Sequence, residues 1–446
     1  MMGANLSKWT MSYFAVAIAW LILAELLMTM GFGFPYAAAE APDTLVVVHI
    51  VCIGWLSMAM CGALFQFVPV LVAKPLFADG WQLPALALLT IGLIALLGGF
   101  MVLGGRLPAW LWLLPIAALF LVAGFGLVVV DLAITVWRAR APMGPAYFVV
   151  AGLCSLCATA GLGSAFACAL AGQGGQALDT LLTSGIPLHA VAGLGGWLTL
   201  TAMGVSYRLL AMFMLSSDVD ERRIRTTLIA GSATIGLVVA GGLLVIAMET
   251  RIDVVLVSAG LLGLATLASY GRDILSLYHS RKRTKLELNT KMAAWGLSSL
   301  VAAVLLAVIL AISRTFPAHI EAFAFLIAFG WLSGLVLAKL YKIVAFLTWL
   351  ETYGPTLGRI ATPRVQDLVI ERRAAKWFAA YFLSVWSGTV ALLLDQPSMF
   401  RIAAFAMTVA TLGIVRQLIR TRRLADVAGS LRPSGISAPH LLYASI

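Results

Sequence analysis

The sequence has few charged residues. Lys, Arg, Asp and Glu make up 11% of its 446 residues, whereas 62% are hydrophobic and the mean hydropathy is +1.00. No polar stretch is long enough to form a separate soluble domain. The composition therefore excludes an ordinary soluble protein and is typical of a polytopic membrane protein.

Several common signatures are also missing. The chain has no P-loop, no G-x-G-x-x-G after a strand and no G-x-S-x-G, which argues against the usual nucleotide sites and serine nucleophiles. Its 5 cysteines all lie in apolar stretches and are poor disulfide candidates. No alternating ten-residue pattern suggests a barrel, so the membrane segments are predicted to be helices.

Long apolar runs are what the sequence has in abundance. Twelve of them are long enough to cross a bilayer as helices. They lie at about 11–34, 45–73, 81–104, 108–137, 145–171, 186–216, 224–248, 252–278, 292–314, 319–350, 374–394 and 399–418. The predicted fold is all-α, with one transmembrane domain over residues 1–446.

The basic residues predict the orientation of these helices. With the N-terminus inside, all but four of the 30 Lys and Arg residues fall on cytoplasmic loops, helix ends or the tail. The four outer ones are Arg106, Arg251, Arg314 and Arg401. By the positive-inside rule both termini are cytoplasmic, and the net charge of +11 faces the inner leaflet rather than nucleic acid.

A short motif occurs three times at long spacing. Gly-Trp-Leu followed by Ser or Thr stands at Gly54–Ser57, Gly196–Thr199 and Gly330–Ser333, with the glycines 142 and 134 residues apart. Three copies in twelve helices predict three pseudo-symmetric four-helix arcs, as repeat-like units at about 11–137, 145–278 and 292–423. A cytoplasmic tail follows at 424–446. The motif then lies on the second helix of each set, and all three of these helices run from outside to inside.

Histidines near these motifs are the candidate site residues. His49 precedes the first motif by five residues and His189 the second by seven, so both should lie near the outer side. Imidazole is a common ligand of haem iron and copper, and ionisable groups at membrane depth usually face a bundle interior or a cofactor. His319, eleven residues before the third motif, is a weaker candidate, because Phe325 stands in the His49 register. A histidine hydrogen-bonded at the interface is the alternative interpretation of each.

Two acids also lie inside predicted helices. Glu25, on the first helix, should lie near the depth of His49, where it would tune a histidine, relay a proton or pair with a polar neighbour. Asp131, near the inner end of the fourth helix, is expected to pair with Arg138 or with water at the interface.

The chain resembles a known family. Three segments carry the similarity: HIVCIGWLSMAMCGALFQFVPVL, HAVAGLGGWLTLTAMGVSYRLLAMFMLS and FGWLSGLVLAKLYKIVAFLTWLETYG. Together with twelve helices in three arcs, they are similar to divergent bacterial members of the haem-copper oxidase (cytochrome oxidase) subunit I superfamily. The resemblance implies that His49 matches an axial ligand of the low-spin haem. It also implies that His189 approximately matches a ligand of the active-site copper.

The chain departs from this family at the oxygen-reducing centre. The seventh helix has no histidine, the tenth lacks a His-x-His, and Gly193 stands where a tyrosine would follow His189 by four. A binuclear centre cannot be built from these side chains, so we expect no oxygen reductase and assign no catalytic residue. Whether the chain is an enzyme stays open.

Three functions follow, in order of preference. The first is a haem-binding membrane protein of the redox or electron-transport type. It would hold haem b, or copper, through His49 and His189, with His319 and Glu25 as further cofactor-binding candidates. The second is a metal-free accessory or assembly subunit of a respiratory or denitrification complex. The third is a transporter of metal or haem. Expected partners are the lipid bilayer of a bacterial inner membrane, other subunits of such a complex or a cytochrome c, and no nucleic acid.

Overall fold

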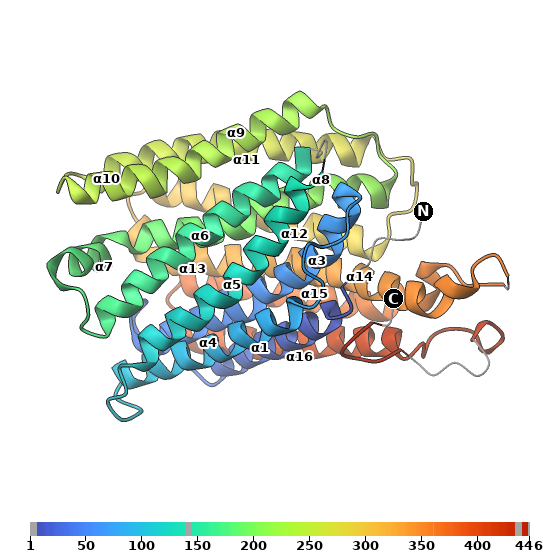
Figure 1. Ribbon diagram of the computed structural model, residues 1–446, viewed down its shortest axis with the longest axis horizontal. Coiled ribbons are helices and arrows are strands. Elements are labelled where there is room, and N and C mark those ends of the chain that lie inside the picture. The colour runs from blue at the N-terminus through green and yellow to red at the C-terminus, as the bar shows by residue number, and fades with distance from the viewer. Residues whose placement is uncertain (1–6, 140–143, 360, 433–438, 445–446) are drawn as a thin grey trace. The chain divides into compact units, whose positions relative to one another are not determined.

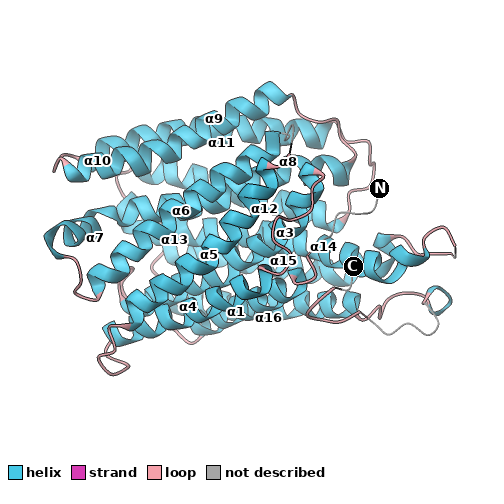
Figure 2. Cartoon of the chain, in the orientation of Figure 1, coloured by secondary structure: helices cyan, strands magenta, loops and turns pink. Residues whose placement is uncertain are grey.

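Long apolar helices make up the chain as a computed structural model describes it, over residues 7–139, 144–359, 361–432 and 439–444. The structure is 80% helical, and no strand occurs among the described residues (Figures 1 and 2). Eleven helices among these residues are long and apolar enough to cross a membrane. The predicted all-α polytopic membrane fold is therefore confirmed.

The helix bounds follow the apolar runs closely. The eleven spans are Thr10–Thr29, Pro42–Val72, Gln82–Leu103, Leu113–Trp137, Gly144–Leu170, Gly175–Met214, Glu221–Ala247, Ile252–His279, Leu288–Ile312, Phe316–Thr356 and Pro397–Arg422. The remaining predicted span forms α15, Glu371–Leu393. The sixth begins eleven residues earlier than predicted. Its first turns are polar, and the hydroxyl of Thr180 bonds the carbonyl of Gln176 four residues back (3.0 Å).

Contacts divide the chain into two units. Among the described residues, unit 1 holds 64–285 and unit 2 holds 7–63 and 286–444. Unit 1 comprises the later part of α3 (Met58–Val72), α4 (Gln82–Leu103), α5 (Leu113–Trp137), α6 (Gly144–Leu170), α7 (Gly175–Ala190), η2 (Val191–Leu200), α8 (Thr201–Met214), α9 (Glu221–Gly236), η3 (Leu237–Gly241), α10 (Gly242–Ala247) and α11 (Ile252–His279). Unit 2 comprises α1 (Thr10–Thr29), α2 (Pro42–His49), η1 (Ile50–Ser57), the start of α3, α12 (Leu288–Ile312), η4 (Phe316–His319), α13 (Ile320–Phe325), η5 (Leu326–Ser333), α14 (Gly334–Tyr353), η6 (Gly354–Thr356), η7 (Val365–Leu368), α15 (Glu371–Leu393), α16 (Pro397–Arg422) and η8 (Gly429–Leu431).

Each Gly-Trp-Leu motif lies at the end of a π-helical segment. These segments are η1, η2 and η5, each set within a longer membrane helix. The three tryptophans, Trp55, Trp197 and Trp331, are at most 1% exposed. In two of the segments the motif serine bonds the carbonyl five residues back, Ser57 to Cys52 and Ser333 to Ala328, both at 2.7 Å. The motif thus marks a specialised backbone geometry as well as a packing position, and such π segments are frequent at functional sites.

Helix pairing repeats along the chain. The helix before each motif packs against the motif segment, α1 on η1, α6 on η2 and α12 on η5. The remaining two helices of each predicted set also pack on one another, α4 on α5, α9 on α11 and α15 on α16. Figure 1 shows the α9–α11 pair side by side. This common pairing is what a four-helix repeat requires.

Close helix approach explains the motif glycine. A Cβ on Gly196 would lie 2.5 Å from both Cβ and Oγ of Ser155 on α6. A Cβ on Gly330 would lie 2.8 Å from Cβ of Ser299 on α12. In both copies a serine of the preceding helix therefore occupies the space in front of the glycine. Small residues at such contacts let membrane helices approach closely.

This contact gives a first testable expectation. The substitution Gly196→Ala should destabilise the protein by about 1–3 kcal/mol, because the new methyl group overpacks the contact with Ser155. Adding Ser155→Gly should restore most of that loss, since it removes the two atoms closest to the new methyl group. Thermal unfolding in detergent measures both variants. A double variant no more stable than Gly196→Ala alone would show that the contact is not the cause.

The described residues of the C-terminal tail pack on unit 2. Arg422, only 3% exposed, pairs with Glu351 (2.7 Å) and donates Nη2 to the carbonyls of His440 (2.5 Å) and Tyr443 (3.0 Å). The backbone N–H of Ala444 donates to the carbonyl of Lys8 (2.9 Å). Earlier in the tail, hydrogen bonding by the Arg420 guanidinium, together with Arg373, holds the pKa of Asp426 below its usual range. The predicted tail is therefore a docked segment where it is described.

Candidate functional site

His49 is the last residue of α2 and directly precedes the π segment η1. The helix begins at Pro42, whose fixed φ suits the first turn. The half-buried His49 ring places Nδ1 2.8 Å from the carbonyl oxygen of Leu45, one turn back. When Nδ1–H donates to that oxygen, Nε2 carries the lone pair that a metal would need. The contact with Leu45 thus sets the orientation of the ring within its own helix.

His189 lies at the end of α7, two residues before η2. Its Nδ1 is 3.1 Å from the carbonyl oxygen of Thr159 on α6, and its ring meets Phe166 edge-on at 5.6 Å between centroids. A Cβ on Gly163 would lie 3.0 Å from the imidazole Cε1, so this glycine makes room for the ring. His189 is therefore oriented by the neighbouring helix, whereas His49 is oriented by its own.

His319 has a different setting from the other two histidines. It ends the short 3-10 segment η4 and precedes α13, in the first turn of the span Phe316–Thr356 that also carries the third motif. At the His49 register stands Phe325, whose ring packs at a tilt against Phe329 (centroids 4.8 Å apart) and meets Phe400 edge-on (5.3 Å). The third motif therefore has a phenylalanine cluster where the first has an imidazole.

Glu25 is fully buried in unit 2. It lies on α1, and its Oε1 accepts a hydrogen bond from the Thr411 hydroxyl of α16 (2.8 Å). Its Oε2 has no hydrogen-bond partner among the described residues. Because α1 and α16 are distant in sequence, only the fold brings this pair together.

A hydrogen-bonded network links the first and third motifs within unit 2. Trp55 donates Nε1–H to the Ser333 hydroxyl (2.8 Å), and Ser333 donates to the carbonyl of Ala328. Tyr381 of α15 donates to the carbonyl of Phe329 (3.0 Å) and interacts electrostatically with Glu25. The sequence analysis did not identify Tyr381. It is a single tyrosine in an apolar run, and this pattern does not distinguish it from a packing residue.

The candidate residues are distributed over both units. His49, Glu25 and His319 belong to unit 2, and His189 belongs to unit 1. Within the described ranges no group of three His, Cys, Asp or Glu residues is arranged to hold a metal ion.

Unit 1 contains two buried carboxylates near the C-terminal ends of their helices. Asp273 of α11 pairs with Arg223 and accepts a hydrogen bond from the Tyr207 hydroxyl (3.0 Å). Asp131 of α5 accepts from the backbone N–H of Ala78 (3.0 Å) and from Gln82 Nε2 (2.9 Å). The prediction that Asp131 pairs with Arg138 is wrong. The carboxylate is used to fix the loop before α4, and the Arg138 guanidinium lies over the Phe77 ring instead.

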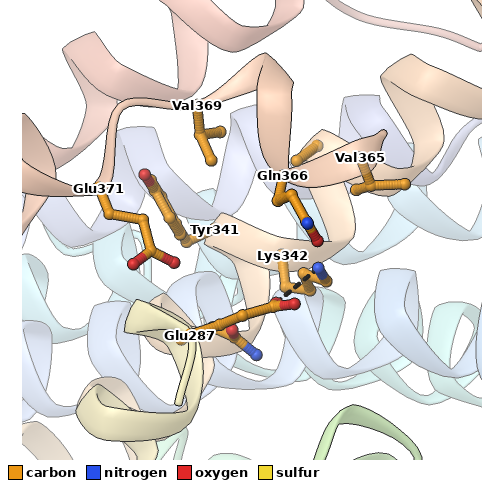
Figure 3. A pocket seen from close by; sticks show the side chains of 9 residues that line it. Glu287, Tyr341, Lys342, Val365, Gln366, Val369 and Glu371 are labelled. Atoms are coloured by element: carbon orange, nitrogen blue, oxygen red, sulfur yellow. Dashed lines mark hydrogen bonds and ion pairs between the residues drawn. The ribbon is translucent and has the colours of Figure 1, made fainter. Parts of the chain in front are cut away.

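A polar pocket lies where α12, α14 and α15 meet in unit 2. Figure 3 shows Lys342 directed toward Glu287, and the Nζ–Oε2 distance is 2.6 Å. Glu371 on the other side accepts from the backbone N–H of Leu288 (2.8 Å). Both carboxylates therefore secure the start of α12, which gives the pocket a structural role.

Comparison with known proteins adds no assignment to this geometry. No protein-family model matches the chain, and a search of curated proteins finds no significant relative.

Proposed function

We propose that this chain is a haem-binding membrane protein of the redox type, with His49 as an axial ligand of one b-type haem near the outer face. The imidazole of His49 is of the type that ligates haem iron. A half-buried imidazole whose Nδ1 is occupied by a backbone carbonyl is the usual arrangement of a histidine that ligates through Nε2. The haem would supply one-electron chemistry, while the chain would hold the iron and limit its contact with water.

The position of His49 before a π segment is the observation that carries the proposal. His279 makes the same bond to the carbonyl four residues back, at 2.7 Å, so the bond alone is no ligand signature. His279, however, ends α11, is exposed, and precedes the basic residues Arg281–Arg283. His49 and His189 both combine a ring nitrogen bonded to a backbone carbonyl with partial burial beside a π-helical motif segment, and of the two His49 is bonded within its own helix. His189 is the second candidate ligand, and His319 the third.

Haem suits this site better than copper. Copper sites in proteins generally combine several nitrogen and sulfur ligands, and the described part of the chain has no three-residue cluster of that kind. Phe325, in the register of His49, cannot supply a second axial ligand from the third motif. Haem iron needs only one protein ligand, which His49 provides.

An absorbance spectrum tests the proposal. The wild-type protein, purified from cells supplied with ample haem, should show a Soret band that the substitution His49→Ala removes. The matched control is His279→Ala, which removes a histidine with the same backbone bond and should leave the band unchanged. Wild-type protein without a Soret band, or an unchanged band in His49→Ala, would contradict the proposal.

The basic residues support a location for this site. We infer a bacterial inner membrane with both termini cytoplasmic, because all but four of the 30 Lys and Arg residues then face inward. In that orientation the start of α2, and with it His49, lies at the periplasmic side, within reach of a soluble electron donor such as a cytochrome c. Reporter fusions at the two ends of the chain test the orientation.

A metal-free accessory subunit is the second candidate. The phenylalanine cluster around Phe325 and the buried motif tryptophans favour it, since they use two motif positions for packing. In that case His49→Ala would leave cellular function intact while partner subunits of a respiratory or denitrification complex still co-purify. No observation favours the transporter hypothesis.

A further inference from the structure

Glu25 has an environment unlike that of the other buried acids. The acids buried as whole residues in the described chain are Glu25, Asp131 and Asp273. Asp273 faces the Arg223 guanidinium, and Asp131 accepts hydrogen bonds from two N–H groups. Glu25 is approached by one neutral hydroxyl, that of Thr411, and its Oε2 has no partner among the described residues.

An ionised carboxylate is very unfavourable in such a place. Burying an unpaired charge away from water costs several kcal/mol or more, and a buried ion is normally retained only beside an opposite charge or several donors. Glu25 has neither among the described residues, and it lies within the membrane span Thr10–Thr29. The neutral acid carries no net charge and still accepts the Thr411 hydrogen bond.

The surrounding charged and titratable groups are few. Tyr381 of α15 interacts electrostatically with Glu25, and its hydroxyl is held by the carbonyl of Phe329. On α16, Arg401 donates Nε–H to the carbonyl of Thr29 at the end of α1 and is itself exposed. His49 ends α2, which also contacts α1. None of these groups makes a hydrogen bond or ion pair with Glu25 in the structure.

We propose that Glu25 is a proton-binding site within the membrane span. In the resting protein at neutral pH the proton resides on Oε2 as a carboxylic acid, and Oε1 accepts the Thr411 hydrogen bond. Release of this proton to water leaves a carboxylate, so occupancy of the site changes the charge of the bundle interior by one unit. This site depends on α1 and α16 and not on a bound haem.

Infrared difference spectroscopy in membranes tests the site. A protonated carboxyl group gives a C=O stretching band that a carboxylate lacks. The isosteric substitution Glu25→Gln should remove one such band at neutral pH. Thr411→Val should retain the band but shift its frequency, because it removes the hydrogen bond to Oε1. Thr408→Val is the matched control, since that hydroxyl donates to Ala404 within α16 and should not affect the band.

Chemical labelling of the wild-type protein tests the same site without any substitution. A membrane-soluble carbodiimide adds across the O–H of a protonated carboxylic acid in an apolar setting, so the whole reagent is retained. Peptide mass analysis of wild-type protein should then find one adduct on Glu25. Identical infrared spectra of folded wild type and Glu25→Gln would overturn the proposal, as would the absence of any adduct on Glu25. Either result is independent of whether a Soret band is present.

Discussion

Replacing Arg422 by methionine is expected to destabilise the protein by about 3–5 kcal/mol and to release residues 440–443 from their docked position. Removing one member of a buried ion pair leaves the other charge uncompensated, and this is among the costliest single changes known. Arg422 is 3% exposed, and its partner is the Glu351 carboxylate at 2.7 Å. It also holds the carbonyls of His440 and Tyr443, which no methionine can do.

Two further variants separate the causes of that loss. Arg422→Met combined with Glu351→Gln should recover part of the stability, because the orphaned charge is then removed. Arg423→Met, at the next and exposed position, should change stability by less than about 0.5 kcal/mol. Thermal unfolding in detergent gives the stabilities, and limited proteolysis of the C-terminus reports on release. Equal effects of the Arg422 and Arg423 substitutions would contradict the ion-pair argument.

Hydropathy predicted the helices well because side chains that face lipid and side chains that face the protein interior are both apolar. Lipid-facing residues such as Leu261 and core residues such as Leu93 are both apolar, so each span is a continuous run. The spans are therefore recognisable without knowing which face is buried. The predicted helix start was least accurate for Gly175–Ala190, where polar first turns extend the helix beyond the apolar run.

The repeated Gly-Trp-Leu motif predicted where the packing segments lie, but it did not predict their π-helical backbone. Gly-Trp-Leu indicates close packing, which the contacts of Gly196 and Gly330 confirm. Whether the backbone is α- or π-helical depends on which carbonyl each backbone N–H bonds, and the side-chain hydroxyl of Ser333 adds a bond to the carbonyl five positions back. The amino-acid composition does not distinguish an α-helix from a π-helix, because the same residues fit both.

Partners distant in sequence could not be predicted at all. Glu25 was recognised as a buried acid, yet nothing near it in sequence points to Thr411, which is 386 residues away. The docked tail is a similar case. Arg422 resembles any basic residue at a helix end, and only the fold brings His440 and Tyr443 back to it. The roles of His49 and His189 as cofactor ligands stay predictions.

The second large effect is expected at Trp55. The substitution Trp55→Ala should cost about 3–5 kcal/mol, because it opens a cavity at a fully buried position and removes the hydrogen bond to Ser333. Trp137→Ala is the matched control, since that side chain is 88% exposed and should contribute little. Unfolding of both variants under identical detergent conditions measures the difference. Similar stability of the two would show that the motif tryptophan is not a packing centre.

The hydrogen bond can be separated from the cavity by a double-mutant cycle. Trp55→Phe keeps most of the ring volume, and Ser333→Ala removes the acceptor, which leaves the indole N–H buried and unpaired at a cost of about 1–3 kcal/mol. The double variant should be more stable than the sum of the single effects predicts, since it has no orphaned donor. Strict additivity would mean that the 2.8 Å contact contributes nothing. A clear coupling would instead show that the first and third motifs stabilise one another, so that the π segment beside His49 is held in place by a residue of the third motif.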